Sequence, residues 1–424
     1  MVDLLEPRRS WSAWAYRRYR RTRRTVGTAL RERLRIDEND SALTRVSLPY
    51  DVMAYFSDPP VNLYQIRQWL YPLEELNKAH PVFILTRNAE TFEHLVHETP
   101  LPVVNARRIA TVDSLCAASD FKLALYVNQS YRNFSALRYP DMLHLYLSHG
   151  ESEKTMYTSS NQVKAYDFVL VAGRAAVERY RSGLINFDVD ARLRTIGRPQ
   201  LDTPDYAGVP HVGNRTTVLY APTWEGDRPS AAYSSVESHG PRIVQSLLSS
   251  GRHRLIYRPH PRTGWTRPEA GDVDKDIRDT IHAAQKRDPQ ARHRVDTAAH
   301  FGPQMAESDV MICDVSAVAM DFLPTGKPLV VTTPVRPEAL VDRSGVLGSV
   351  YDLRASDAGR VAELVDDWVA SDVRKEERAG WVEHYFGDVT PGASMRRFLE
   401  ACDEAVQLRE KLLVGKRDRM VVGP

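Results

Sequence analysis

Short apolar runs alternate with helical patterns through most of the chain, and this alternation constrains the fold more than any other feature. The expected strands of the first series are Asp51–Phe56, Val82–Leu85, Pro102–Asn105, Lys122–Val127, Met142–Leu147, Asp167–Ala172 and Arg194–Gly197. A second series comprises Thr217–Ala221, Arg254–Arg258, Arg294–Asp296, Val310–Cys313 and Pro328–Thr332. Helical patterns occur at Val61–Lys78, Arg174–Ser182, Arg242–Ser249, Ala317–Leu323, Glu363–Asp372 and Ser394–Leu413. Strands that alternate with helices form parallel sheets, so the sequence predicts two Rossmann-like, doubly wound α/β domains.

A polar stretch with glycines and prolines, residues 203–215, separates the two series and is typical of a linker. Ligands of doubly wound sheets bind outside the carboxyl ends of the strands, so we expect a cleft where the two domains face each other. The expected divisions are a basic segment at 1–45, a first domain at 46–204, a second domain at 216–400, and a C-terminal helix and tail at 401–424.

Composition and missing motifs exclude several classes of protein. The 57 basic side chains nearly balance the 55 acidic ones, which argues against a surface coated with nucleic acid. The three cysteines are too far apart for a C-x-x-C pair, and no stretch approaches the roughly 18–20 apolar residues that span a bilayer. Phosphate-loop, dinucleotide-binding, nucleophile-elbow and H-E-x-x-H motifs do not occur. We therefore expect a cytoplasmic protein without a metal or a resident cofactor.

The segment from Arg8 to Arg35 breaks this charge balance, because it is rich in arginine and almost free of acids. On a helix, Trp11, Tyr19 and Val26 fall on one face, whereas arginines such as Arg17 fall on the other. This pattern is typical of a helix on an anionic membrane surface. Packing on its own domain and contact with nucleic acid are the alternatives.

Polar side chains follow several of the expected strands. His149 and Gly150 come after Met142–Leu147, and a histidine at a strand tip is suited to act as a base near neutral pH. Arg258 and His260 stand in an Arg-Pro-His-Pro turn, where the prolines stiffen the backbone and the two side chains suit a phosphate. Each feature alone is also compatible with a purely structural loop.

Two further loops belong to the second domain. Asp314 and Ser316 lie between a strand and a helix, where backbone N–H groups and the helix dipole favour an anion. Ser316 is equally suited to be a helix N-cap. The stretch Ala221–Asp227 carries Thr223, an aromatic residue and acids at another strand end, which suit either a ligand or a turn.

Together these loops resemble the CDP-glycerol glycerophosphotransferase family, the teichoic-acid primases and polymerases. The family's HG loop is matched by His149 and Gly150, its APTW by Ala221–Trp224, and its R-P-H-P turn by Arg258–Pro261. Its G-x-P-R-x-D stretch corresponds to Gly197–Asp202. Its SDVLITDYSSVMFDFLLTGKP corresponds to SDVMICDVSAVAMDFLPTGKP, which is residues 308–328.

The resemblance implies a glycosyltransferase-B fold and transfer of glycerol phosphate, or another polyol phosphate, from a CDP-polyol to an acceptor hydroxyl with release of CMP. It assigns the catalytic roles to His149, as the base, and to His260, which with Arg258 would stabilise the diphosphate. Gly150, Asp314, Ser316, Ala317 and Thr223 complete the expected substrate-binding set. The family's work on lipid-linked glycans implies a cell-wall or lipid-linked glycan acceptor and a place on the inner face of the cell membrane.

Some positions depart from the family pattern. Val315 and Ala317 stand where the family has tyrosine and a second serine, and Gln200 stands where it has arginine. These departures leave glycerol, ribitol and other polyols open. A nucleotide-sugar glycosyltransferase of the same fold is the alternative function, and a catalytically inactive membrane scaffold is a third.

Overall fold

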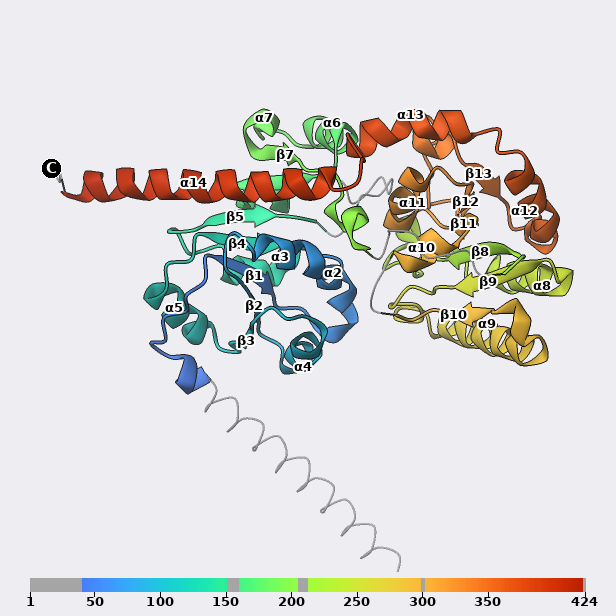
Figure 1. Cartoon of the computed structure of the whole chain (residues 1–424), viewed down its shortest axis with the longest axis horizontal. Helices are drawn as coiled ribbons and strands as arrows, with labels where there is room; N and C mark the ends of the chain where they lie inside the picture. The colour runs from blue at the N-terminus through green and yellow to red at the C-terminus, as the bar shows by residue number, and fades with distance from the viewer. Residues whose placement is uncertain (1–39, 149, 151–159, 205–212, 299–301, 422–424) are drawn as a thin grey trace, which may run out of the picture.

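The computed structural model describes residues 40–148, 150, 160–204, 213–298 and 302–421. The expected basic helix at 8–35 and His149 lie outside these residues. Within them the chain forms two parallel α/β sheets, each covered by helices, which lie next to each other (Figure 1). The predicted α/β fold class is therefore confirmed.

The first sheet has seven strands within the described residues, in the order β3-β2-β1-β4-β5-β6-β7, and all pairs are parallel. Its strands are β1 (Val52–Phe56), β2 (Val82–Thr86), β3 (Val103–Asn105), β4 (Leu123–Tyr126), β5 (Leu143–Tyr146), β6 (Phe168–Val171) and β7 (Leu193–Thr195). Alternate residues of β1 enter two different hydrophobic clusters, Val52 and Phe56 on one face and Met53 and Tyr55 on the other. Helices thus bury both faces, which explains the continuous apolar runs in the sequence.

The helices of this domain are mostly short. They are η1 (Pro60–Asn62), α2 (Leu63–Arg67), α3 (Leu70–Leu76), α4 (Ala89–Glu98), α5 (Ile109–Ala118), η2 (Tyr131–Ser135), η3 (Asn161–Ala165), α6 (Arg174–Gly183), α7 (Val189–Arg192) and η4 (Pro199–Asp202). The single helix expected at Val61–Lys78 is wrong, because α2 ends at Arg67 and α3 begins at Leu70. Pro72 lies in the first turn of α3, where its missing N–H is tolerated, whereas a continuous helix would place it in the interior.

The second sheet has six strands in the described part of the chain, in the order β10-β9-β8-β11-β12-β13, again all parallel. They are β8 (Thr216–Ala221), β9 (His253–Tyr257), β10 (Arg294–Val295), β11 (Val310–Cys313), β12 (Leu329–Thr332) and β13 (Tyr351–Leu353). Sequence analysis missed the three-residue edge strand β13, whose central Asp352 is exposed. Both sheets reverse their strand order at one point, between β1 and β4 and between β8 and β11.

The helices around the second sheet include the 20-residue α9, which sequence analysis did not identify. They are η6 (Pro229–Ala231), α8 (Gly240–Ser250), α9 (Pro268–Arg287), η7 (Pro289–Ala291), α10 (Pro303–Glu307), α11 (Ala317–Phe322), η8 (Leu323–Thr325), η9 (Val346–Gly348), η10 (Ala358–Arg360), α12 (Val361–Ala370) and α13 (Lys375–Phe386).

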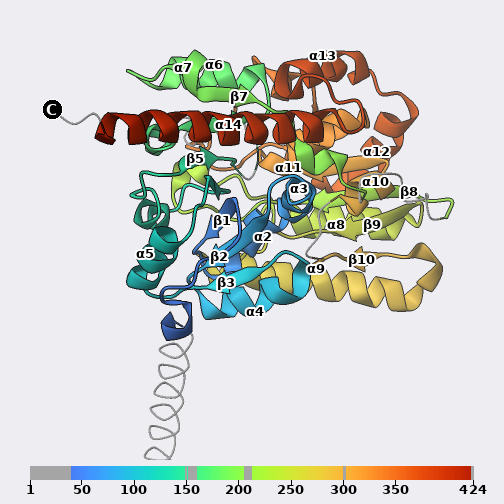
Figure 2. The same cartoon turned by 60° about the vertical axis from the view of Figure 1, so that its left-hand side comes forward.

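The last helix, α14 (Ala393–Val421), returns from the second domain to the first. Figures 1 and 2 both show it lying along the first domain. Phe398 and Cys402 are buried in the same cluster as Trp69, and the rings of Trp69 and Phe398 are 5.3 Å apart. The helix begins eight residues before the expected division at 401, and its amino end is capped by Asp202, which accepts hydrogen bonds from the backbone N–H groups of Gly392 and Met395.

A buried ion pair joins the two domains. Nε of Arg198 donates to Asp321 at 2.7 Å, and only 5% of either side chain is exposed. A second nitrogen of Arg198 donates to Gln68, also at 2.7 Å. The neighbouring Gly197 has φ +72° and lies so close to α14 that a Cβ would be 2.2 Å from the hydroxyl of Ser394. The Gly197–Asp202 stretch thus holds both the second domain and α14 in place.

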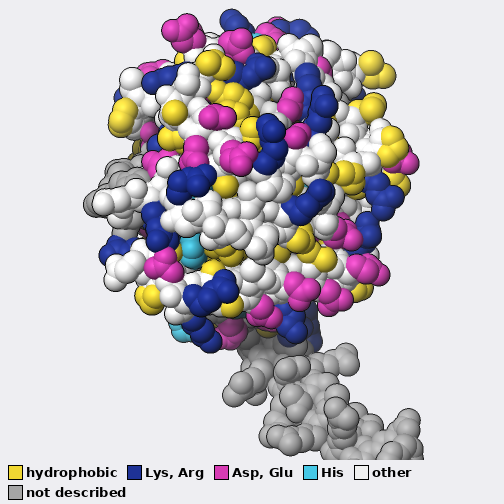
Figure 3. All heavy atoms as spheres, turned by 90° about the vertical axis from the view of Figure 1, so that its right-hand side faces the viewer, with side chains coloured by type: hydrophobic (Ala, Val, Ile, Leu, Met, Phe, Trp, Pro, Cys, Tyr) yellow, Lys and Arg dark blue, Asp and Glu magenta, His cyan; other side chains and the backbone are white. Residues whose placement is uncertain are grey.

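Figure 3 shows the face at the second-domain end, where acidic, basic and hydrophobic side chains are interspersed. No helix among the described residues has an apolar stretch that could cross a bilayer.

Replacing Arg198 by Met should lower the free energy of unfolding by about 3–5 kcal/mol, because the Asp321 carboxylate stays buried without its partner. Urea denaturation monitors the change. Arg181→Met is the control, since its pair with Asp190 is exposed and is worth about 1 kcal/mol or less. An Arg198→Met protein as stable as the wild type would show that the two domains do not close on this pair in solution.

Candidate active site

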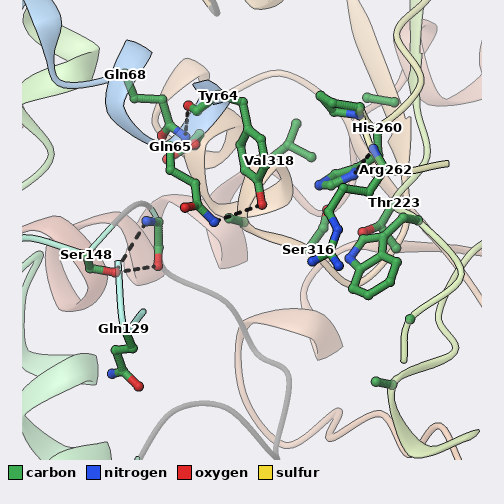
Figure 4. A pocket seen from close by; sticks show the side chains of 18 of the residues that line it. Tyr64, Gln65, Gln68, Gln129, Ser148, Thr223, His260, Arg262, Ser316 and Val318 are labelled. Carbon is green, nitrogen blue, oxygen red and sulfur yellow. Dashed lines mark hydrogen bonds between the residues drawn. The ribbon is translucent and has the colours of Figure 1, made fainter. Parts of the chain in front are cut away.

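A cavity of about 500 Å³ lies between the two domains. Residues of both domains line it. The first domain contributes Tyr64, Gln65, Gln68, Gln129, Tyr146, Ser148, Gly150, Arg179 and Tyr180. The second domain contributes Thr223, Trp224, Asp227, Arg258, His260, Arg262, Ser316, Ala317, Val318 and Asp321. In Figure 4 the labelled residues separate accordingly, with Gln65, Gln68, Gln129 and Ser148 on one side and Thr223, His260 and Arg262 on the other.

The cavity lies where doubly wound sheets bind ligands. The loops that follow β8 and β11 contribute Thr223 and Ser316, and these two strands flank the point where the strand order reverses. In the first domain, Gln129 follows β4, which flanks the corresponding point of that sheet. The expected position of the cleft at the strand ends is therefore found.

The Arg-Pro-His-Pro turn follows β9, and both of its functional side chains line the cavity. The guanidinium of Arg258 donates to Asp296 at 2.9 Å and to the carbonyl oxygen of Ala298 at 3.0 Å. Nδ1 of His260 accepts a hydrogen bond from the backbone N–H of Arg262 at 3.1 Å. An accepting Nδ1 leaves the proton of the neutral ring on Nε2, so Nε2 is the donor atom of His260.

Glu225 shapes the loop that follows His260. Its carboxylate is 5% exposed and accepts from the backbone N–H groups of Gly264 at 3.1 Å, Thr266 at 2.8 Å and Arg267 at 3.2 Å. Burial opposes ionisation, but the backbone hydrogen bonds outweigh it and lower the pKa of Glu225 below its usual 4.5. This acid of the Ala221–Asp227 stretch therefore orders the loop at 262–267.

Asp314, which we expected in the substrate-binding set, is not among the residues that line the cavity. Its side chain is completely buried, and Oδ2 accepts from the backbone N–H of Thr223 at 2.7 Å and of Ser235 at 3.1 Å. The hydroxyl of Thr332 donates to Oδ1. Burial raises the pKa of Asp314, and these hydrogen bonds offset the effect only in part. The residue positions Thr223, which does line the cavity.

Ser316 lines the cavity at the N-cap position of α11, yet its hydroxyl donates to the carbonyl oxygen of Asp314 at 3.0 Å and does not cap the helix. Ala317 and Gly150 meet across the domain boundary, since a Cβ on Gly150 would be 2.7 Å from the Cβ of Ala317. Gly150 also has φ +152°, a conformation that side chains disfavour. Position 150 therefore requires a glycine, and the small side chain of Ala317 leaves room for its backbone.

His149 lies outside the described residues, whereas its neighbours are placed. Nε1 of Trp69 donates to the carbonyl oxygen of Ser148 at 2.6 Å. The hydroxyl of Ser148 donates to the carbonyl oxygen of Gly150 at 3.2 Å (Figure 4). The two neighbours of His149 in the sequence, Ser148 and Gly150, therefore line the cavity.

Sequence analysis missed the polar side chains that the first domain contributes. Asn128 donates to Gln65 and to the buried Asp58, both at 2.8 Å, and Gln65 donates to the hydroxyl of Tyr64 at 3.2 Å. The ring of Tyr64 meets that of His260 edge-on, with centroids 5.2 Å apart. Tyr64 and Gln65 belong to α2, which carries no motif, so only the fold brings them to the site.

Among the described residues, no group of three or more His, Cys, Asp and Glu side chains could hold a metal ion. Histidines 94 and 97 lie exposed on α4.

Replacing Glu225 by Gln should destabilise the protein by about 2 kcal/mol at neutral pH, because an amide accepts these hydrogen bonds less strongly than a carboxylate. Since the pKa of Glu225 is lowered by folding, its stabilisation is complete above about pH 4.5 and is lost as the pH falls through the lowered pKa. Thermal unfolding across this range measures the difference, with Glu237→Gln, whose partner Arg267 is at the surface, as the control. A difference from wild type that persists in acid would contradict this role.

Comparisons with known proteins agree with this geometry. A search of curated proteins finds no match. The solved structure of the wall teichoic acid polymerase TagF is 13% identical with a TM-score of 0.55, over 93% of this chain and 99% of that one. A histidine-to-asparagine variant of TagF soaked with CDPG is 14% identical with a TM-score of 0.51, over 94% and 99%. MnaA of S. aureus in complex with UDP is 12% identical with a TM-score of 0.53, over 85% and 97%. At these identities the likeness shows the fold alone, which is of the glycosyltransferase-B type.

A family model provides the functional comparison. The model described as CDP-glycerol:poly(glycerophosphate) glycerophosphotransferase matches residues 147–366, which is more than half of the chain. The matched range contains the Arg-Pro-His-Pro turn and the loops after β8 and β11 that line the cavity. The chain therefore belongs to the CDP-glycerol:poly(glycerophosphate) glycerophosphotransferase family.

Proposed function

We propose that this enzyme transfers glycerol phosphate, or a related polyol phosphate, from a CDP-polyol to a hydroxyl group of a cell-wall or lipid-linked glycan and releases CMP. The observation that carries the proposal is the contrast between the two walls of the cavity. Arg258, His260 and Arg262 gather on the second-domain wall, whereas amides and hydroxyls make up most of the opposite wall. Cationic and N–H donors suit a diphosphate, and neutral polar groups suit a polyol or glycan.

The donor would lie on the second domain. His260 would face the diphosphate, with Arg258 and Arg262 on the same wall and Thr223 and Ser316 beside them. A CDP-polyol is favoured by the family of the chain and by the CDPG soaked into the TagF variant.

The reaction needs a base for the acceptor and stabilisation for the leaving group. In the proposed mechanism His149 takes the proton of the acceptor hydroxyl as its oxygen attacks the β-phosphorus of the donor. The bond between the β-phosphorus and the bridging oxygen breaks, and CMP leaves with the electron pair. Nε2–H of His260 donates a hydrogen bond to the phosphate oxygens on which negative charge increases.

Wild-type protein should release CMP from CDP-glycerol or CDP-ribitol in the presence of a membrane lipid extract as acceptor. His260→Ala should lower kcat by about 100- to 1,000-fold, as expected for the loss of one preorganised donor. His149→Ala should lower kcat by about 100- to 10,000-fold while the donor still binds, as expected for the loss of a general base. His94→Ala is the matched control, because this histidine is exposed on α4.

The same assay includes UDP-sugars, which a glycosyltransferase of this fold would use. Release of UDP from a UDP-sugar, with both CDP-polyols inert, would refute the proposal in favour of that alternative. Unchanged turnover of both histidine variants would also contradict it.

We further propose that residues 8–35 bind the enzyme to an anionic membrane, where a lipid-linked acceptor would be found. The arginines and aromatic residues of this segment support the proposal. The first described residue, Asp40, accepts hydrogen bonds from the backbone N–H groups of Arg107 and Arg108, so the described chain begins beside the start of α5.

Deleting residues 1–35, which leaves Asp40 in place, should weaken binding to anionic vesicles and remove most of its salt dependence. Vesicle sedimentation measures this effect, and the affinity for CDP should stay unchanged. Equal sedimentation of the deleted and full-length chains would exclude a membrane role for the segment.

A further inference from the structure

The two arginines of the Arg258–Arg262 stretch differ in their surroundings. Both line the cavity. The guanidinium of Arg258 is paired with Asp296 at 2.9 Å and also bonds the carbonyl oxygen of Ala298. Its charge is therefore largely balanced within the protein.

Arg262 has no carboxylate partner among the described residues. Its guanidinium lies 4.1 Å from the ring centroid of Trp224 and 5.7 Å from that of Trp265. Its Nε is buried and makes no hydrogen bond. The acidic residues that line the cavity do not neutralise the charge of Arg262, because Asp321 pairs with Arg198 and Asp227 lies beside Arg228. Aromatic stacking thus holds in place a cation whose N–H groups have no acceptor in the described part of the chain.

The backbone places this cation next to the catalytic histidine, since the N–H of Arg262 donates to Nδ1 of His260. Glu225 fixes the rest of the loop through the N–H groups of Gly264 and Thr266. A stacked, unpaired guanidinium on a fixed loop is preorganised for an anion. The second-domain wall therefore contains one arginine whose charge is paired within the protein, Arg258, and another that is placed for a ligand, Arg262.

We propose that, of the two arginines on the second-domain wall, Arg262 and not Arg258 binds the phosphate groups of the substrate. The proposal rests on the proposed function for the identity of the substrate. Arg258 supports the turn through Asp296, whereas Arg262 contacts the diphosphate of the donor beside His260. The same chemistry would also suit a phosphodiester of the acceptor, which the experiment distinguishes.

The test is calorimetric titration of the full-length wild type, Arg262→Gln and Arg262→Lys with cytidine, CDP, UDP, inorganic pyrophosphate and glycerol 3-phosphate. Arg262→Gln should weaken the binding of CDP and pyrophosphate by about 10- to 100-fold and leave the binding of cytidine unchanged, as expected for the loss of charge-assisted hydrogen bonds. The affinities of Arg262→Lys for CDP and pyrophosphate should lie between those of the wild type and Arg262→Gln, because an ammonium keeps the charge but not the planar, forked geometry of a guanidinium. The salt dependence of CDP binding should become shallower in Arg262→Gln.

Arg267→Gln is the matched control, since this arginine belongs to the same loop, pairs with Glu237 and does not line the cavity. Near-ultraviolet circular dichroism of the tryptophans shows whether the Arg262 variants keep the loop. If Arg262→Gln keeps the wild-type affinity for CDP, pyrophosphate and glycerol 3-phosphate, the inference is overturned.

The remaining outcomes separate the inference from the proposed function. If Arg262→Gln loses affinity for glycerol 3-phosphate alone, Arg262 binds a phosphate group, and that group belongs to the acceptor. If Arg262→Gln loses affinity for pyrophosphate while the wild type binds UDP as tightly as CDP, the phosphate-binding role of Arg262 is supported and a cytidine-specific donor is refuted.

Discussion

The buried ion pair between Arg198 and Asp321 is the contact on which the cavity depends. Arg198 also donates to Gln68, so one guanidinium connects a cavity residue of each domain. Separating the domains would leave a buried charge without its partner, which is costly in a medium of low dielectric constant. The contact of Gly150 with Ala317 closes the same boundary a short distance away. The width of the cavity therefore follows from a few residues of the Gly197–Asp202 and α11 segments.

Carboxylates in the loops around the cavity position its walls. Asp314 orders the backbone of Thr223, Glu225 orders the loop after His260, and Asp296 holds Arg258. Each acid is nearly or completely buried and makes its hydrogen bonds to the protein. These carboxylates therefore make hydrogen bonds that stabilise the loops of the protein. Arg258, His260 and Arg262 line the cavity from the second domain and carry N–H donors suited to phosphate groups.

Much of the fold could be predicted from the sequence, because buried parallel strands are continuous apolar runs, and each of the twelve expected strands matches a strand with ends shifted by at most a few residues. The edge strand β13 was missed because it is short and half exposed, and the break between α2 and α3 depends on Pro72. Motifs located the second-domain wall but could not show that Asp314 is buried beneath it. Tyr64 and Gln65 carry no motif, and only tertiary contacts bring them to His260. Arg262 lies two residues after His260, but its surroundings could not be predicted from the sequence.

The central claim is that the second-domain wall binds the diphosphate and the first-domain wall binds the hydroxyl-bearing acceptor. A crystal structure with CDP-glycerol bound tests it most directly. The account predicts β-phosphate oxygens about 3 Å from Nε2 of His260 and from the guanidinium of Arg262, with the glycerol directed towards Gln65 and Ser148. A diphosphate bound to the first-domain wall, or outside the cavity, would contradict it.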